Sequence, residues 1–131
     1  MNFNPAMTVP PRYTPEIMLP PYAYVPGHRP HPNRDPKGHG QGPDPGDIPA
    51  LADLRDWQGN RIYLSGIDLF NHGYYWEAHE MWEALWHRTG GDAVTAMFLK
   101  GLIKLTAAGV KIREGNPRGA ASLNTGFRQE F

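Results

Sequence analysis

The distribution of proline constrains the fold of this 131-residue chain more than any other feature. Thirteen of its fourteen prolines lie between Pro5 and Pro49. Proline lacks a backbone N–H and disfavours the helical conformation of the residue before it. We therefore expect residues 1–49 to form an irregular proline-rich arm. Residues 50–131 remain for a packed domain of about 80 residues, a size at which a hydrophobic core is marginal.

The predicted arm is more apolar than a solvated linker. Its central part contains Ile17, Met18, Leu19, Tyr22, Tyr24 and Val25. Because such side chains gain from burial, we expect the arm to pack on the domain. The arm also carries His28, His31 and His39, which are interpreted as turn and surface residues because no two of them share a rigid element.

The second unit shows helical periodicity and no alternation typical of a strand. Apolar residues recur at spacings of three and four over residues 51–72, with a break predicted at Gly59 and Asn60. Gly73 is expected to end this first helix, and further helices are predicted over residues 74–88 and 92–114, with Gly115 as the stop. A fourth helix is predicted from Pro117 onward. The fold class is therefore all-α, a small bundle of about four helices in antiparallel hairpins.

Composition narrows the classes of function. The formal net charge is zero and cysteine is absent. Zero net charge disfavours a nucleic-acid partner, and the lack of cysteine excludes disulfides and thiolate metal sites. No charged segment followed by an apolar run is present at the N-terminus, and no apolar run approaches about 18 residues. We expect no membrane span and a cytoplasmic location.

The stretch "GYYWEAHEMWEALWH", residues 73–87, divides into two faces when residues are placed about 100° apart on a helix. One face is predicted to lie in the core; it holds Tyr74, Tyr75, Ala78, Met81, Trp82, Leu85 and Trp86. The opposite face is polar and holds Trp76, Glu77, His79, Glu80, Glu83 and His87. The stretch is therefore half core and half polar surface.

The polar face supplies candidates for chemistry. His79, Glu80 and Glu83 are the candidate catalytic acid or base groups, and His79 is one turn from Glu83. His79, Glu83 and His87 are the candidate ligands of a divalent metal ion. The letters "HEMWE" depart from the metalloprotease pattern H-E-x-x-H, because Glu83 stands at the second histidine position. The simpler interpretation is a rim histidine tethered to Glu83, and this interpretation is favoured.

Trp76 is unexpected on the polar face, because a large aromatic ring is seldom left in water. We expect the segment around Tyr22 and Tyr24 to fold back over Trp76, with a polar cleft at the seam. The candidate ligand- or partner-binding residues are Trp76, His72, Trp86, Lys111 and Asn116.

The two halves of the domain differ in charge. Residues 51–92 contain seven acids and three bases, and residues 93–131 contain two acids and six bases. We therefore expect Glu77, Glu80 and Glu83 to pair with a row formed by Lys100, Lys104 and Lys111. The third helix is predicted to bury a broad face that includes Val94, Met97, Phe98, Gly101, Leu102, Leu105, Ala108, Gly109 and Ile112.

Two blocks, "LFNHGYYWEAHEMWEALW" and "FLKGLIKLTAAGVKIREGNPRGAASL", resemble the family named domain of unknown function 309. The resemblance covers residues 69–123, and the arm is similar to an N-terminal extension found in one branch of that family. It implies a small helical bundle without an established activity. Family domains usually continue past the point that matches Phe131, which implies that this chain ends before a last helix.

Two functions remain open from the sequence. The first is a non-catalytic module with a His/Glu polar cleft that binds a protein partner or a second copy of itself, and no cofactor is predicted for it. The alternative is a hydrolase-like enzyme, metal-dependent or acid/base, that uses His79, Glu80 and Glu83. Whether the protein is an enzyme is left open.

Overall fold

A computed structural model of the chain describes residues 9–40, 54–89 and 93–115. It contains the 3-10 helix η3 (Leu54–Gly59) and the α-helices α1 (Arg61–Asn71), α2 (Tyr75–Trp86) and α3 (Ala93–Arg113). No strand occurs within these three ranges, so the all-α class is confirmed for the described part. The predicted fourth helix, from Pro117, lies outside the described residues.

Three of the predicted helix boundaries are confirmed. The break at Gly59 and Asn60 separates η3 from α1, and the Asn60 side chain caps α1 by accepting the Tyr63 N–H at 2.9 Å. Gly73 and Gly115 follow α1 and α3 with φ angles of 88° and 83°, a left-handed conformation that glycine adopts without a steric penalty.

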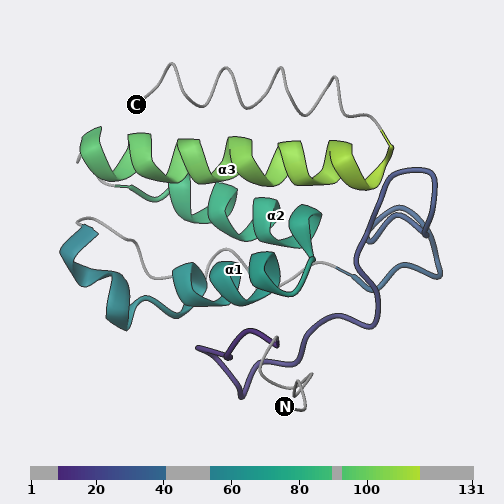
Figure 1. The fold of residues 1–131 in the computed structure, drawn as a ribbon, viewed down its shortest axis with the longest axis horizontal. Helices are drawn as coiled ribbons and strands as arrows, with labels where there is room; N and C mark the ends of the chain where they lie inside the picture. Colours follow the sequence, from purple (N-terminus) through teal and green to yellow (C-terminus); the bar gives the residue numbers. More distant parts are fainter. Residues whose placement is uncertain (1–8, 41–53, 90–92, 116–131) are drawn as a thin grey trace, which may run out of the picture.

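The three α-helices run antiparallel in chain order, with α2 between α1 and α3 (Figure 1). The core lies on both sides of α2, and its most buried members include Ala78, Leu85 and Leu99, each at 0% exposure. Among the described residues, the buried cluster consists of Ile62, Leu69, Ala78, Met81, Trp82, Leu85 and Leu99. The predicted core face of α2 is thereby confirmed for Ala78, Met81, Trp82 and Leu85.

Two glycines allow aromatic rings to pack directly on helix backbones. A Cβ at Gly66 would lie 2.1 Å from Nε1 of Trp82, and a Cβ at Gly109 would lie 2.7 Å from the Tyr75 ring. Gly109 therefore allows the Tyr75 ring of α2 to lie close to the backbone of α3. The equivalent contact at Gly66 holds α1 against α2.

The predicted core face of α3 is partly wrong. Val94, Met97 and Ile112 were expected to be buried, but they are 64%, 49% and 61% exposed. Thr95 and Thr106 face inward instead, both at 0% exposure. Because α3 is apolar on nearly every side, its periodicity does not define which face is buried. The inward face is the one on which Thr106 contacts His79 of α2.

By length and composition alone, α3 could also cross a membrane, and it is the one helix of the described residues for which this holds. A core helix passes the same test, so this is weak support for a membrane span. α3 packs on α2, and 28% of its apolar window is buried inside the protein.

Candidate functional site

A buried carboxylate on α1 fixes the start of the described N-terminal segment. Asp68, 1% exposed, accepts hydrogen bonds from the Tyr13 N–H at 2.8 Å and the Thr14 N–H at 2.9 Å. The Thr14 hydroxyl donates to it at 2.7 Å, and Arg12 Nε donates at 3.0 Å. The same guanidinium group donates to the carbonyls of Thr14 and Ile17. Asp68 thus ties residues 12–17 to α1.

The Asp68 contacts favour its charged form. Burial alone would raise the pKa of the Asp68 carboxyl, but the hydrogen bonds from Tyr13, Thr14 and Arg12 outweigh it and lower the pKa below its ordinary value. Asp68 therefore remains a carboxylate under ordinary conditions, and its negative charge is matched by Arg12.

A second buried carboxylate, on α2, holds a later part of the segment. Oε2 of Glu77, a residue 6% exposed, accepts the Tyr24 N–H at 2.8 Å and lies 2.7 Å from Nε2 of His39. Nδ1 of His39 lies 2.8 Å from the carbonyl oxygen of Gly40. Glu77 was placed on the polar surface from the sequence; it is buried because residues 22–40 cover it.

The expectation that His39 is a surface residue is wrong. Its side chain is 5% exposed, and its ring lies 4.6 Å from the Tyr22 ring, measured between centroids. The Tyr22 hydroxyl donates to the Pro30 carbonyl at 2.7 Å and accepts the His39 N–H at 3.1 Å. These contacts close residues 22–39 into a loop that presents His39 to Glu77.

Trp76 is covered by the loop, as the sequence indicated. Its ring meets the Tyr24 ring edge-on, with centroids 5.1 Å apart. The His31 ring also meets the Trp76 ring edge-on, with centroids 5.8 Å apart. The Tyr74 hydroxyl adds a hydrogen bond to the Pro20 carbonyl at 2.9 Å. Residues 12–40 thus meet α1 and α2 along a line of contacts made by Asp68, Tyr74, Trp76 and Glu77. We call this line the polar seam.

The candidate catalytic histidine makes two polar contacts. Nε2 of His79 lies 3.0 Å from Oε2 of Glu83, which confirms the i,i+4 contact expected from the sequence. Nδ1 of His79 lies 3.2 Å from Oγ1 of Thr106 on α3. The sequence did not identify Thr106, because nothing in the spacing of α3 places it opposite His79.

The Thr106 hydroxyl, the His79 imidazole and the Glu83 carboxylate thus stand in the order that activates a nucleophile in hydrolases. The hydroxyl, however, is 0% exposed and donates to the Ile103 carbonyl of its own helix at 2.5 Å. A nucleophile must reach its substrate, and this oxygen is enclosed between α2 and α3. The geometry favours a structural link between the two helices.

The candidate metal ligands are not gathered into a metal site. His87 is exposed and its ring meets that of Trp86 edge-on, with centroids 5.0 Å apart. Within the described ranges, no group of three or more His, Cys, Asp or Glu side chains could hold a metal ion. The His79–Glu83 contact is therefore a pair without a third ligand there.

The pKa of Glu80 is raised, first by the loss of hydration. The negative charges of Glu83 and Glu77 add to this effect, while His79 and His31 oppose it. Glu80 therefore lies in the field of His79, Glu83 and Glu77 on α2 and of His31 on the loop.

The remaining candidates are scattered. His72 follows α1, and its Nε2 is buried with no hydrogen-bond partner among the described residues. Trp86 packs against the core, and Lys111 Nζ donates to Glu114 at 3.4 Å. Asn116 lies outside the described residues. The structure does not bring these side chains together with Trp76.

The predicted pairing of the acids of α2 with the lysine row of α3 is wrong for its two ends. Glu77 bonds to Tyr24 and His39, and Lys111 bonds to Glu114. The acids of α2 are instead engaged by histidines: His39 reaches Glu77 across 38 residues of sequence, and His79 reaches Glu83 within the helix.

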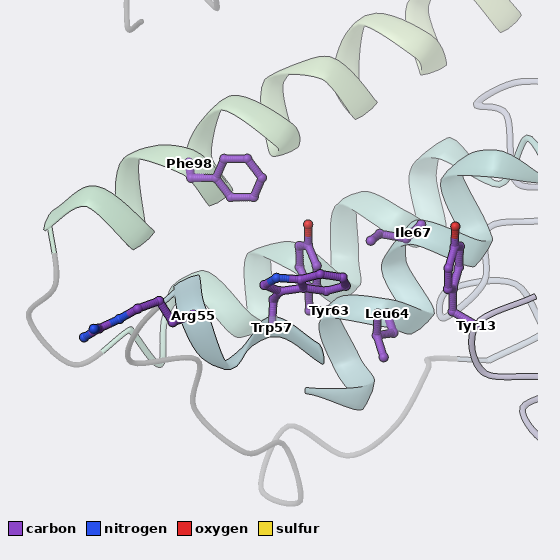
Figure 2. A pocket seen from close by; sticks show the side chains of 7 residues that line it. All are labelled: Tyr13, Arg55, Trp57, Tyr63, Leu64, Ile67 and Phe98. Atoms are coloured by element: carbon purple, nitrogen blue, oxygen red, sulfur yellow. The ribbon is translucent and has the colours of Figure 1, made fainter. Parts of the chain in front are cut away.

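An open groove of about 550 Å³ adjoins the start of the polar seam at Tyr13. Its lining comes from the N-terminal segment, η3, α1 and α3: Tyr13, Arg55, Trp57, Tyr63, Leu64, Ile67 and Phe98. Figure 2 shows Trp57 and Tyr63 in the middle of the groove, with Arg55 and Tyr13 at its ends and Phe98 facing them from α3. We call this site the aromatic groove.

The aromatic groove exposes large apolar side chains to solvent. Trp57 is 40% exposed and Tyr13 is 49% exposed. The rings lie in loose edge contact, with the Tyr63 centroid 6.3 Å from those of Trp57 and Phe98. Partial burial raises the pKa of the Tyr63 hydroxyl. The sequence did not reveal this groove, because its walls come from four separate segments.

The family model described as "Domain of unknown function (DUF309)" matches residues 63–123. Over these residues the chain is similar to that family, as the two sequence blocks indicated. No curated protein and no solved structure matches the chain.

Proposed function

We propose that the protein is a non-catalytic self-association module that joins a second copy of itself through the aromatic groove and the adjoining end of α3. The observation that carries the proposal is the exposure of aromatic and aliphatic side chains on one face. Contiguous exposed apolar surface of this kind marks interaction sites in folded proteins.

The shape of this face supports a second copy as the occupant. Val94 and Phe98 are one turn apart on α3, and Met97 lies beside them. Phe98 forms a wall of the groove, while Val94 and Met97 stand out from the same end of α3 at 64% and 49% exposure. A two-fold interface requires one patch to carry both a hollow and the protrusion that fills it. This face has both.

Charge and core size support the same occupant. The formal net charge of the chain is zero, so two copies meet without long-range repulsion. The domain predicted from the sequence has only about 80 residues, and small domains often gain stability by association. The polar contacts of His79 with Glu83 and Thr106 are satisfied within one copy and leave the binding role to the aromatic groove.

Sedimentation velocity over a range of protein concentrations tests the proposal. We expect a reversible shift from monomer to dimer in the parent chain. Met97→Glu is expected to raise the dissociation constant about tenfold or more, because a two-fold interface would bury the new carboxylate twice. Met18→Glu is the matched control, since Met18 is 89% exposed and does not line the groove.

Three results would overturn the proposal. The first is a parent chain that stays monomeric at the highest concentration. The second is a dimer that Met97→Glu leaves intact. The third is a monomer whose Trp57 fluorescence changes on addition of an apolar or proline-rich peptide, which would identify a different occupant of the same groove.

A further inference from the structure

We propose that residues 12–17 belong to the self-association interface, and that Asp68 couples the docking of these residues on α1 to the binding of the second copy. This inference rests on the self-association proposed above and adds what regulates it. The interface is complete only while residues 12–17 are docked.

Tyr13 is the residue that the described N-terminal segment contributes to the lining of the aromatic groove. Figure 2 shows its ring at one end of the groove, and Leu64 and Ile67 of α1 line the groove as well. Tyr13 is 49% exposed, so it presents apolar surface to the molecule that fills the groove. A second copy seated in the groove therefore contacts the N-terminal segment as well as the helices.

Asp68 sets the position of Tyr13. It follows Ile67 directly and stands about one turn after Leu64 on α1, so it lies beside two residues of the groove wall. Oδ1 of Asp68 accepts the Tyr13 N–H at 2.8 Å, and Oδ2 accepts the Thr14 N–H at 2.9 Å. Because these bonds use the Tyr13 backbone, the Tyr13 ring is left for the groove.

Arg12 holds the segment in the shape that Asp68 binds. Its Nε donates to Oδ2 of Asp68 at 3.0 Å, and its guanidinium group also donates to the Thr14 carbonyl at 2.9 Å and to the Ile17 carbonyl. The Ile17 N–H closes the same turn by donating to the Thr14 carbonyl at 2.9 Å. Arg12 thus fixes the turn to α1, although Arg12 itself does not line the groove.

A second polar contact holds the same segment, but it is weak. Glu16 pairs with Arg61 at the start of α1, and their side chains are 55% and 51% exposed. Solvent and salt screen such a pair, so it contributes little to docking. The Asp68 carboxylate is buried and accepts charged and neutral hydrogen bonds, so it is the stronger attachment of residues 12–17 to α1.

Docking of the segment and self-association therefore stabilise each other. A second copy contacts Tyr13 in the groove only while residues 12–17 are docked, so it binds the docked form more tightly than the undocked form. Thermodynamic linkage makes the effect reciprocal, because the second copy favours docking by the same factor by which docking favours the second copy.

Sedimentation velocity of the full chain with Arg12→Ala tests the first direction of this coupling. The substitution loosens residues 12–17 and changes no residue that lines the groove. We expect the dissociation constant of the dimer to rise about tenfold, which is within the usual range of coupling between sites. Arg29→Ala is the matched control, because Arg29 lies over the Tyr22 ring at 5.5 Å and does not line the groove. It is expected to keep the parent dissociation constant.

Amide hydrogen exchange of the parent chain tests the reverse direction. We expect protection of the Thr14 amide to rise about tenfold between dilute and saturating protein concentration, because the second copy holds the docked segment. The Tyr24 amide, bonded to Glu77 at 2.8 Å, is the internal reference and is expected to rise less.

The outcomes separate the coupling from the self-association on which it rests. If Met97→Glu weakens the parent dimer while Arg12→Ala associates as tightly as the parent, the coupling is overturned and self-association stands. If the protection of Thr14 and Tyr24 rises equally in the parent dimer, the coupling is overturned even where Arg12→Ala fails to fold. A parent chain that stays monomeric would overturn both.

Discussion

Along the polar seam, buried polar side chains are bonded to one another, whereas along the aromatic groove, large rings face water. Asp68 is 1% exposed and accepts bonds from three residues, while Trp57 is 40% exposed in a row of loosely touching rings. A buried polar group must be paired, so such groups fix one arrangement of the chain. Exposed apolar surface is left to gain from a partner. This difference is why we propose a structural role for the seam and a binding role for the groove.

The largest effect is expected from the seam. Asp68→Ala removes the acceptor of the Tyr13 and Thr14 amides and leaves Arg12 without its counter-charge. We expect the free energy of unfolding to fall by about 3 kcal/mol, measured by urea denaturation. Asp56→Ala, at an exposed acid in η3, is the control and is expected to change it by about 0.5 kcal/mol or less. A loss below about 1 kcal/mol for Asp68→Ala would contradict the role of the seam.

The same carboxylate predicts an effect of acid. Since the folded pKa of Asp68 is lowered from its ordinary value of 3.8, its stabilisation is present above that value and is lost as pH falls through the folded pKa. Asp68→Asn cannot titrate. The difference in unfolding free energy between the parent and Asp68→Asn should therefore shrink as pH falls below about 4. A difference that stays constant from neutral pH into acid would show that the charge is not the stabilising feature.

A smaller effect is expected at the candidate catalytic histidine. His79→Gln removes contacts with Thr106 and with the 45% exposed Glu83 side chain. We expect a loss of about 1 kcal/mol or less in unfolding free energy, because solvent screens the Glu83 contact. The exposed His87→Gln serves as the comparison. A hydrolytic activity that is present in the parent and abolished by His79→Gln would show that His79 has a catalytic role and not only a structural one.

The smallest effect on monomer stability is expected at the groove. Met97→Glu lies on an exposed helix position, where substitutions usually change stability by about 0.5 kcal/mol or less. Association stabilises the folded state by mass action, so the parent Tm should rise with protein concentration and the Met97→Glu Tm should not. Calorimetry at several concentrations checks this. If the Tm of the parent and that of Met97→Glu depended equally on protein concentration, the proposal that the groove binds a second copy would be contradicted.

Much of the fold could be predicted from local sequence signals. Spacing of apolar residues placed the three α-helices, and the glycines at 73 and 115 marked two helix ends. The core face of α2 was correct because its polar and apolar residues are well separated. The core face of α3 was not correct, because the sequence of an almost wholly apolar helix does not show which face is buried. The division into a 1–49 arm and a 50–131 bundle stays a prediction.

The partners of the polar residues could not be predicted, because they are far apart in sequence. Asp68 meets Thr14 across 54 residues, and Glu77 meets His39 across 38. One signal was available for the first of these: Asp68 stands one turn after Leu64 and next to Leu69, on a face that is otherwise apolar. No comparable signal pointed to His39, whose segment has no periodicity.

The most direct test of the account is to identify what enters the aromatic groove. Phe98→benzoylphenylalanine places a photoreactive group on the groove wall, and a mixture of isotopically light and heavy chains distinguishes cross-links between copies from those within one. The account predicts a cross-link between copies to Trp57 or to the Val94–Phe98 end of α3. A cross-link confined to one copy, or one between copies that maps to the polar seam, would contradict it.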